Sequence, residues 1–496
     1  MVNIITGTTN KPMATEQLKS FFNSHEDLSG YLYIGYPIIG TVNGAFRIDA
    51  LWLSKDKGIV VFNLIEARDI SGYEDYQDDC ANKIEAKLRG YKELVSKRTL
   101  CVNISVVTFA PALKIINPND DYPLCNEDNL ETTLNDISWD KPDYYGQLVS
   151  VLQAISTIRK SKKRREIANS NSRGAKLQSI EDSIANLDNR QSRAVIETVE
   201  GVQRIRGLAG SGKTIVLALK AAYLHAQHPD WKIAVTFNTR SLKGQLRQLI
   251  NTFYIEQTNE EPEWDNIQII QAWGASGGGE RNGIYYTFCA TNNVAYHDFR
   301  SAMSQFGRTD PFGEVCKKAI IEATSVQQLY DAILVDEAQD FSPSFLLMCY
   351  TMLREPKRLV YAYDELQNLR SQSLPSPEEI FGKTRDGRPR VSFEAPAEGK
   401  PEQDIILEKC YRNSRPALVT AHALGFGIYR AAEKASESGM VQMFEQNSLW
   451  EDIGYELVEG SLNDGSHVVL KRTAKGSPEF LEAHSPIDDL IEFECF

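Results

Sequence analysis

The sequence lacks several features that would assign it to a special class of protein. Its 496 residues contain no stretch of about 18 uninterrupted apolar residues, the length that a membrane span needs. The first residues have neither the basic segment nor the apolar run of a signal peptide. The eight cysteines include no Cys-x-x-Cys pair, so the sequence indicates neither a zinc site nor a disulfide framework. We therefore expect a cytoplasmic protein with reduced cysteines and no membrane contact.

An excess of positive charge is also missing. The net charge is −13, with 42% hydrophobic and 24% charged residues. These proportions are typical of soluble globular proteins. The negative balance argues against a protein that coats a polyanion over its whole surface, although it is compatible with a local basic groove. The length predicts about two to four domains, because single cores stop growing well below it.

The pattern of residues 1–135 predicts a mixed α/β unit. The expected elements are a polar helix, three strands, a helix and a strand, at 14–23, 31–39, 46–53, 58–65, 75–97 and 100–109. Residues 136–186 are polar and helical and contain a basic run at 159–165. We expect this segment to link two domains, and its basic run to be either a solvated face or a phosphate contact.

The clearest motif is the segment Gly-Leu-Ala-Gly-Ser-Gly-Lys-Thr at 207–214. It lies between an apolar run and a helix-favouring segment, which is the strand-loop-helix context of a P-loop. Glycines allow the backbone N–H groups of such a loop to surround a phosphate at a helix N-terminus. Lys213 would contact the β- and γ-phosphates, and Thr214 would offer a hydroxyl to Mg²⁺. The residues expected to bind nucleotide here are Gly207, Gly210, Ser211, Gly212, Lys213 and Thr214.

A second motif completes the predicted site. The apolar run 332–335 is typical of a buried strand and ends at Asp336 and Glu337. We expect Asp336 to hold Mg²⁺ and Glu337 to orient and deprotonate the attacking water. Together with the strand-like runs 232–237 and 358–363, these motifs predict a parallel-sheet ATPase unit over 187–370, with a helical insertion at about 280–328.

With these residues the chain resembles superfamily-one helicases of the UvrD/Rep type. Further segments are similar to the motifs of that family in the same order: 187–195 to the Q motif, 236–242 to motif Ia, 271–273 to a strand-contacting motif, 336–340 to motif II, 363–367 to motif III and 411–414 to motif IV. The resemblance covers 187–496 and implies an α/β fold with RecA-like motor domains.

The resemblance also implies roles for single residues. Gln191 would read the adenine edge, Gln339 would couple the nucleotide to the other domain, and Gln367 would sense the γ-phosphate. Arg412 would supply a guanidinium to the γ-phosphate, for which a rigid and always charged fork is suited. The residues expected to carry hydrolysis are thus Lys213, Glu337, Gln367 and Arg412.

The motif positions also predict contacts with single-stranded DNA. Phe237, Asn238 and Trp273 are the candidates, because aromatic rings can stack on bases. For both rings a place in the core is the alternative. The family has a histidine at the position of Gln271, so this motif departs from the pattern. No segment resembling motif V or VI follows residue 414, and we expect 371–496 to be the incomplete start of a second RecA-like domain.

The N-terminal unit resembles nuclease-related domains of the PD-(D/E)XK type, which are restriction-endonuclease-like α/β folds. Asp49 fits the first metal-binding acid, but Asn63 and Ile65 stand where the family has its glutamate and lysine. Glu66 is a candidate substitute, although strand alternation points it to the other face. A degenerate site is therefore expected, with an altered active site and a different α/β fold as alternatives.

Together these resemblances imply a DNA-dependent ATPase of the helicase type that uses ATP and Mg²⁺. The setting would be DNA repair or antiviral, anti-phage defence, and the N-terminal unit would bind DNA or a protein partner. Two alternatives are a nucleotide-gated interaction protein that does not translocate and a nuclease switched by the ATPase.

Overall fold

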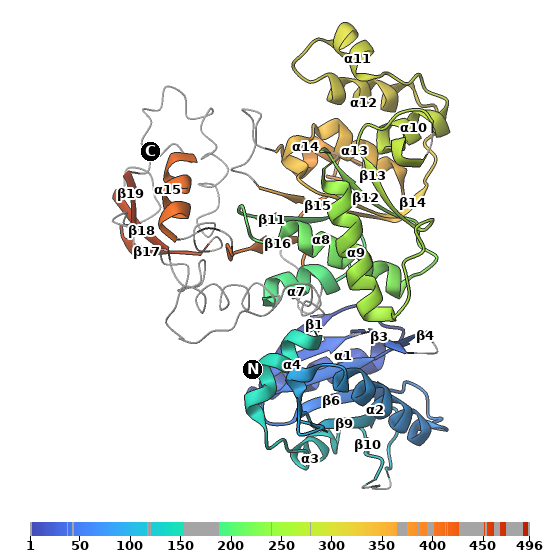
Figure 1. The fold of residues 1–496 in the computed structure, drawn as a ribbon, viewed down its shortest axis with the longest axis vertical. Coiled ribbons are helices and arrows are strands. Elements are labelled where there is room, and N and C mark those ends of the chain that lie inside the picture. Colours follow the sequence, from blue (N-terminus) through green and yellow to red (C-terminus); the bar gives the residue numbers. More distant parts are fainter. Residues whose placement is uncertain are drawn as a thin grey trace.

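The computed structural model shows a mixed α/β protein with parallel strands in two six-stranded sheets (Figure 1). It describes residues 2–36, 38–41, 44–116, 119, 121–152, 188–239, 241–277, 279–364, 374–384, 386–393, 401–411, 413, 415–425, 451, 454–460, 467–472 and 490–494. Within these ranges no helix combines the length and apolar character required to cross a membrane. The α/β class predicted from the sequence is confirmed.

The N-terminal sheet has the strand order β1-β2-β5-β6-β9-β10. Its strands are β1 (Val2–Thr6), β2 (Gly30–Ile34), β5 (Ala50–Ser54), β6 (Gly58–Leu64), β9 (Ile104–Phe109) and β10 (Leu124–Cys125). The pairs β2–β5 and β5–β6 are antiparallel, and the others are parallel. The continuous apolar runs of β5 and β6 are fully buried because helices cover both faces of the sheet.

The helices and small hairpins of this unit refine the prediction. The sheet is covered by α1 (Pro12–Ser24) on one face and α2 (Tyr73–Arg89) on the other. The helix expected over 75–97 ends early, at Arg89, because Gly90 is a poor helix former. Two hairpins and three short helices complete the unit: β3 (Ile38–Thr41) with β4 (Gly44–Arg47), β7 (Val95–Ser96) with β8 (Thr99–Leu100), η1 (Lys92–Leu94), α3 (Leu130–Asn135) and η2 (Pro142–Tyr144).

The first part of the predicted linker belongs to the N-terminal unit. Helix α4 (Tyr145–Leu152) buries Leu148 in the core, and the Trp139 indole donates a hydrogen bond to the Cys101 carbonyl at 2.9 Å. The unit therefore extends past the predicted boundary at 135. The basic run 159–165 lies outside the described residues.

The second sheet is entirely parallel and has the order β13-β12-β14-β15-β11-β16. Its strands are β11 (Gln203–Gly207), β12 (Ile233–Phe237), β13 (Ile267–Gln271), β14 (Tyr330–Val335), β15 (Leu353–Tyr363) and β16 (Asp404–Leu407). The parallel strands expected near 232–237, 332–335 and 358–363 are confirmed. Because β16 pairs with β11, the sheet continues past the predicted domain boundary at 370.

Helices cover both faces of the parallel sheet. One face carries α7 (Asn189–Ile196), α8 (Lys213–Gln227) and α9 (Leu242–Thr258), and the other carries α10 (Ile284–Asn292), α12 (Pro311–Glu322), α13 (Pro343–Met352) and α14 (Pro377–Phe381). This parallel-sheet unit also contains the short helices η3 (Gly279–Arg281), α11 (Phe299–Phe306) and η4 (Ala338–Asp340). Helices α10, α11 and α12 lie where the helical insertion was predicted, at one end of the molecule (Figure 1).

The N-terminal unit and the parallel-sheet unit share one hydrophobic core. Tyr33 and Tyr36 pack in the same cluster as Tyr223 of α8. The Gly35 carbonyl accepts hydrogen bonds from the Tyr223 hydroxyl (3.2 Å) and from the Gln227 side-chain amide (2.6 Å). We call this contact of Gly35, Tyr36 and Arg47 with the C-terminal end of α8 the joint. It brings the N-terminal unit against the helix that starts at the P-loop.

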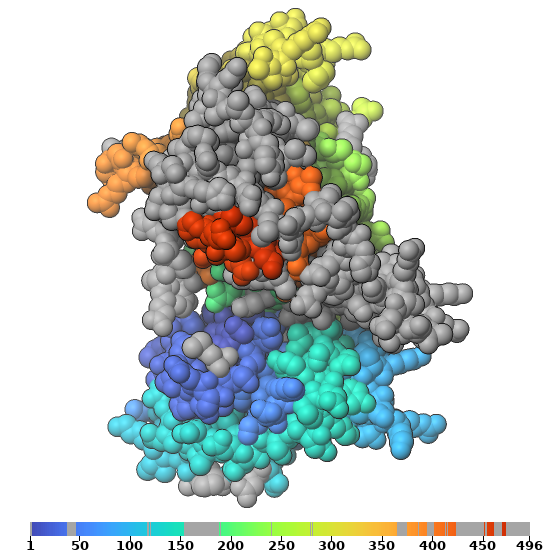
Figure 2. All heavy atoms as spheres, turned by 90° about the vertical axis from the view of Figure 1, so that its left-hand side faces the viewer, coloured from blue at the N-terminus to red at the C-terminus, as the bar shows by residue number. Residues whose placement is uncertain are grey.

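The C-terminal segment adds a small antiparallel sheet. It consists of β17 (Tyr455–Glu459), β18 (His467–Arg472) and β19 (Leu490–Glu494), beside α15 (Arg415–Gly425). His422 of α15 and the Tyr455 hydroxyl are hydrogen-bonded at 2.8 Å. In Figure 2 the described residues of this segment (red) lie between the α11–α12 end (yellow) and the N-terminal unit (blue).

Candidate nucleotide site

The glycine-rich loop connects the end of β11 to the start of α8. Gly210 and Gly212 have φ of 84° and 89°, a left-handed conformation that favours glycine. A Cβ atom at Gly207 would lie 2.4 Å from the Ser211 Oγ, and one at Gly212 would lie 2.8 Å from the Gln191 Nε2. The loop conformation therefore requires glycine at these positions. It places the unpaired N–H groups of the first turn of α8 at the loop, which favours an anion there.

Lys213 points back into this loop. Its ammonium donates to the carbonyl oxygens of Gly207 (2.8 Å) and Leu208 (3.2 Å), and it lies 3.5 Å from a carboxylate oxygen of Asp364. Its side chain is only 6% exposed. A buried cation is thus fixed beside the predicted phosphate position.

Thr214 and Asp336 bring the two predicted halves of the site together. The Thr214 hydroxyl donates to the Asp336 carboxylate at 2.9 Å, across the carboxyl edge of the sheet. Asp336 is fully buried, and this burial, with the neighbouring charge of Glu337, raises its pKa to about 6, against the opposing effects of Thr214 and Lys213. A hydroxyl and a buried carboxylate in contact form a donor set that suits a divalent cation with oxygen ligands.

Glu337 adopts an unusual backbone conformation beside Asp336. Its φ of 51° lies in the left-handed region, which a glutamate adopts at an energetic cost and which is often found at functional sites. Gln339 donates a hydrogen bond to the Glu337 carboxylate at 2.7 Å and accepts one from the Asp364 N–H at 3.0 Å. The Gln339 amide therefore ties the carboxylate of Glu337 to the end of β15.

Gln191, in the first turn of α7, forms hydrogen bonds to both the helix start and the glycine-rich loop. It forms a capping box at the start of α7, in which its N–H donates to the Asp188 carboxylate (2.8 Å) and its side-chain oxygen accepts from the Asp188 N–H (3.1 Å). Its side-chain amide also donates to the Ser211 carbonyl at 2.8 Å. This side chain thus bridges α7 and the P-loop, and its adenine contact stays a prediction.

The segment around residue 411 contacts the same loop from about 200 residues away in the sequence. The Tyr411 N–H donates to the Gly210 carbonyl (3.1 Å), and its hydroxyl donates to the Asp188 carboxylate (2.9 Å). Cys410 donates to the Ala209 carbonyl at 3.0 Å. The resemblance to motif IV at 411–414 included Tyr411 without giving it a role, and sequence reasoning missed the contact of Cys410. The predicted Arg412 and Gln367 lie outside the described residues.

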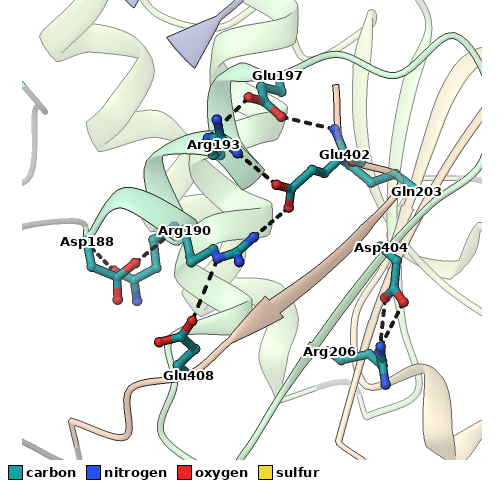
Figure 3. A network of polar contacts seen from close by, with 10 residues as sticks. Asp188, Arg190, Arg193, Glu197, Gln203, Arg206, Glu402, Asp404 and Glu408 are labelled. Atoms are coloured by element: carbon teal, nitrogen blue, oxygen red, sulfur yellow. Dashed lines mark hydrogen bonds and ion pairs between the residues drawn. The ribbon is translucent and has the colours of Figure 1, made fainter. Parts of the chain in front are cut away.

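An ion-pair network holds this segment against α7 (Figure 3). Glu402 accepts hydrogen bonds from Arg190 and Arg193, each at 2.7 Å, and Arg190 also approaches Glu408 at 3.8 Å. Asp404 of β16 pairs with Arg206 of β11 at 2.7 Å. The chain on both sides of β16 is therefore fixed to the elements that frame the P-loop.

The residues predicted to contact nucleic acid differ in their exposure. Phe237 is fully buried in the core, so its ring has no free face and the expectation that it stacks on a base is wrong. Trp273 is half-buried: its indole donates to the His297 carbonyl at 3.0 Å, and its ring stacks on Phe312 at 4.8 Å. Asn238 is exposed, and its carbonyl accepts a hydrogen bond from Gln271.

The acids of the N-terminal unit have other partners. Asp49 accepts hydrogen bonds from the Lys11 ammonium (2.6 Å) and from the Leu64 N–H (3.0 Å). Glu66 accepts hydrogen bonds from the Met13 N–H (2.6 Å) and the Ala14 N–H in the first turn of α1. Across the part of the chain that the structure describes, no group of three or more His, Cys, Asp and Glu side chains is placed to hold a metal ion.

The loop residues fit a bound phosphate. The Ser211 Oγ is buried and has no hydrogen-bond partner among the described residues, which leaves a donor in the loop for a ligand. The glycine cradle, the buried ammonium of Lys213 and the contact between Thr214 and Asp336 supply the other groups that a magnesium–nucleotide complex needs.

No model of a known protein family matches the chain, and no curated protein matches it either.

Proposed function

We propose that this protein is an ATP hydrolase of the superfamily-one helicase type, a motor that single-stranded DNA stimulates. The observation that carries the proposal is the 2.9 Å contact between Thr214 and Asp336 beside a P-loop. These residues are 122 positions apart, and the parallel sheet brings them to one edge. Ligands of open parallel sheets bind at this edge.

Each residue of the site has a distinct part in the proposed reaction. The loop N–H groups and Lys213 bind the phosphates, and Thr214 and Asp336 would hold Mg²⁺, whose charge would offset that of the phosphates. Glu337 accepts the proton of the attacking water, and Gln339 holds its carboxylate in place. Gln191 and Tyr411 fix the loop from two sides.

The nucleic-acid part of the proposal rests on the same edge of the sheet. Asn238 follows β12, and Trp273 lies two residues after β13, so both are near the strand end that carries Asp336. A strand bound there would be close enough to affect the nucleotide site. We propose single-stranded DNA as this partner, with the N-terminal unit contributing to DNA or protein binding in DNA repair or anti-phage defence.

ATP hydrolysis with and without single-stranded DNA tests the proposal. Lys213→Ala should lower turnover by roughly a hundredfold or more, because it removes the cation that contacts the phosphates. Lys317→Ala, an exposed lysine on α12, is the matched control and should leave turnover unchanged. Equal rates for wild type and Lys213→Ala would exclude the P-loop as the hydrolytic site.

A second candidate is a nucleotide-gated interaction protein. The observation that favours it is the joint, because α8 begins at the P-loop and ends against the N-terminal unit. Nucleotide binding at one end of α8 would then alter the surface that the N-terminal unit presents to a partner. This candidate gains support if single-stranded DNA leaves the hydrolysis rate of the whole chain unchanged. DNA should stimulate ATP hydrolysis by a motor that moves along it.

A further inference from the structure

Asp364 is a buried acid at the centre of the site that the motif comparison did not single out. It directly follows β15, the strand that lies between the Asp336 strand β14 and the P-loop strand β11. Its side chain is 1% exposed, and its carboxylate lies 3.5 Å from the Lys213 ammonium. The carboxylate therefore occupies a position beside the cation that the proposed function assigns to phosphate.

In this arrangement each N–H donor of the Lys213 ammonium has an acceptor nearby. An ammonium has three N–H donors, and Lys213 faces three acceptors: the carbonyls of Gly207 and Leu208 and the carboxylate of Asp364. A phosphate that contacts Lys213 must displace at least one of them. The carboxylate is the one whose negative charge competes with phosphate for the same ion pair.

The surrounding charges make this competition strong. Asp336 and Glu337 lie at the neighbouring strand end, and the charge of Lys213 also acts on the carboxylate of Asp336, so the site holds three acids and the buried ammonium of Lys213. Asp364 is also held in place, because its N–H donates to Gln339, which is itself bonded to Glu337. A nucleotide without a cation would enter a site that repels it, and burial reduces the screening of that repulsion by water.

We propose that Asp364 is the resident counter-ion of Lys213 in the nucleotide-free site, and that an incoming phosphate group replaces it. Asp364 is thus a positioning residue that acts through Lys213. It holds the ammonium in the loop and makes tight nucleotide binding depend on Mg²⁺, whose charge offsets the acids. This inference rests on the proposed function, because it concerns the first step at the same site.

The test measures binding of a fluorescent ATP analogue to the full chain, in EDTA and in Mg²⁺. Asp364→Asn removes the charge and keeps the shape, so it should bind the metal-free analogue about tenfold more tightly than wild type does. In Mg²⁺ the increase in affinity of Asp364→Asn over wild type should be smaller, because the cation already offsets the charge of the carboxylate. Asp364→Glu restores the charge and should return the affinity toward the wild-type value.

Asp364→Ser removes the same charge with a smaller side chain and serves as a second variant if the asparagine variant does not fold. Unchanged or weaker metal-free binding by these neutral variants would overturn the counter-ion role and leave the proposed function intact. If wild type itself does not bind the analogue, the proposed function fails, and this inference fails with it.

Discussion

The two six-stranded sheets of this protein both place an acid at a strand end, but they give it opposite surroundings. Asp336, at the end of β14, is fully buried and contacts the Thr214 hydroxyl and the Glu337 N–H. Asp49, just before β5, has a 24% exposed side chain and an ion pair with Lys11 at 2.6 Å. Among the described residues, Asp49 thus forms an ion pair with a lysine, whereas Asp336 accepts its hydrogen bonds from neutral groups.

This difference follows from the residues beside each acid. In the parallel sheet, Lys213 is 6% exposed and belongs to a glycine-rich loop at a helix N-terminus, a setting that favours a bound anion. In the N-terminal sheet, the pairing of Ala50 with Phe62 sets Asp49 opposite Asn63, an amide that donates to the Thr108 hydroxyl. A carboxylate opposite an amide supplies only one negative charge, which Lys11 neutralises. The comparison explains why we propose catalysis at the first site alone.

Neutralising each acid in turn tests most directly whether the two acids differ in their contribution to ATP turnover. Asp336→Asn should reduce ATP turnover by roughly a hundred- to a thousandfold, because it removes a charged Mg²⁺ ligand from a buried site. Asp49→Asn should leave turnover within about twofold, since the partners of its carboxylate in the described part of the chain, Lys11 and Leu64, belong to the N-terminal unit. Steady-state ATP hydrolysis in Mg²⁺ measures both.

A substitution of Asp49 also tests for nuclease activity. Wild type and Asp49→Ala should fail alike to nick DNA in Mg²⁺ or Mn²⁺. Cleavage by wild type that disappears in Asp49→Ala would mean that the N-terminal strand end is an active site, and the contrast between the sheets would be lost.

A second prediction concerns the joint, where the two compared regions meet. Tyr223 is fully buried and donates to the Gly35 carbonyl. Tyr223→Leu should lower the free energy of unfolding by about 3 kcal/mol, through a cavity and a lost hydrogen bond. Tyr223→Phe, which removes only the hydroxyl, should cost about 1 kcal/mol.

Thermal unfolding measures these effects and also tests the shared core. With one core, the N-terminal unit and the parallel-sheet unit should unfold in a single transition in wild type. Two separate transitions in wild type, with only one of them shifted by Tyr223→Leu, would show that the units are stabilised independently.

The sequence predicted the parts of the site that depend on local patterns. The glycine spacing at 207–214 and the apolar run before Asp336 are properties of short segments, and the structure places both at one sheet edge. By contrast, Tyr411 and Asp364 reach the P-loop through strand order, which no local pattern specifies. For Phe237 the motif position predicted contact with a base, but the side chain of this strand residue points into the core.

The same reasoning explains the missed boundaries. β16 is four residues long, and only its pairing with β11 reveals that it belongs to the parallel sheet. Likewise, β1 lies ahead of the first predicted helix, and its parallel pairing with β2 gives it a place in the N-terminal sheet. Long-range pairing of short strands is the information that single-sequence periodicity lacks.

A third prediction tests the polar side of the joint. The exposed Arg47 donates to the Gln227 carbonyl at 2.7 Å and to the Ala226 carbonyl at 3.3 Å, at the C-terminal end of α8. A cation there complements the helix dipole, so Arg47→Ala should cost about 1 kcal/mol. Arg47→Lys, which keeps the charge, should cost less. Equal losses for the two variants, measured by thermal unfolding, would contradict the dipole argument.

The smallest effect is a pH dependence at the same helix end. His228 follows α8 and stacks on Trp231 at 3.8 Å. Burial first, and then the positive charges of Arg47 and Arg358, lower the pKa of His228 from 6.5 to about 4, although Glu200 and Asp331 oppose this shift. Between pH 6.5 and 4 the unfolded chain therefore binds a proton that the folded chain does not.

It follows that the free energy of unfolding should fall as the pH is lowered from 6.5 toward 4, and that His228 contributes no pH dependence above this range. His228→Phe keeps the ring on Trp231 and removes the titration, so its melting temperature should fall less between pH 7 and pH 5 than that of wild type. Part of the fall should persist, because burial also lowers the pKa values of His225 and His422. An identical fall in wild type and His228→Phe would show that the ring is solvated enough to titrate normally, and that the joint is more open than its contacts with α8 indicate.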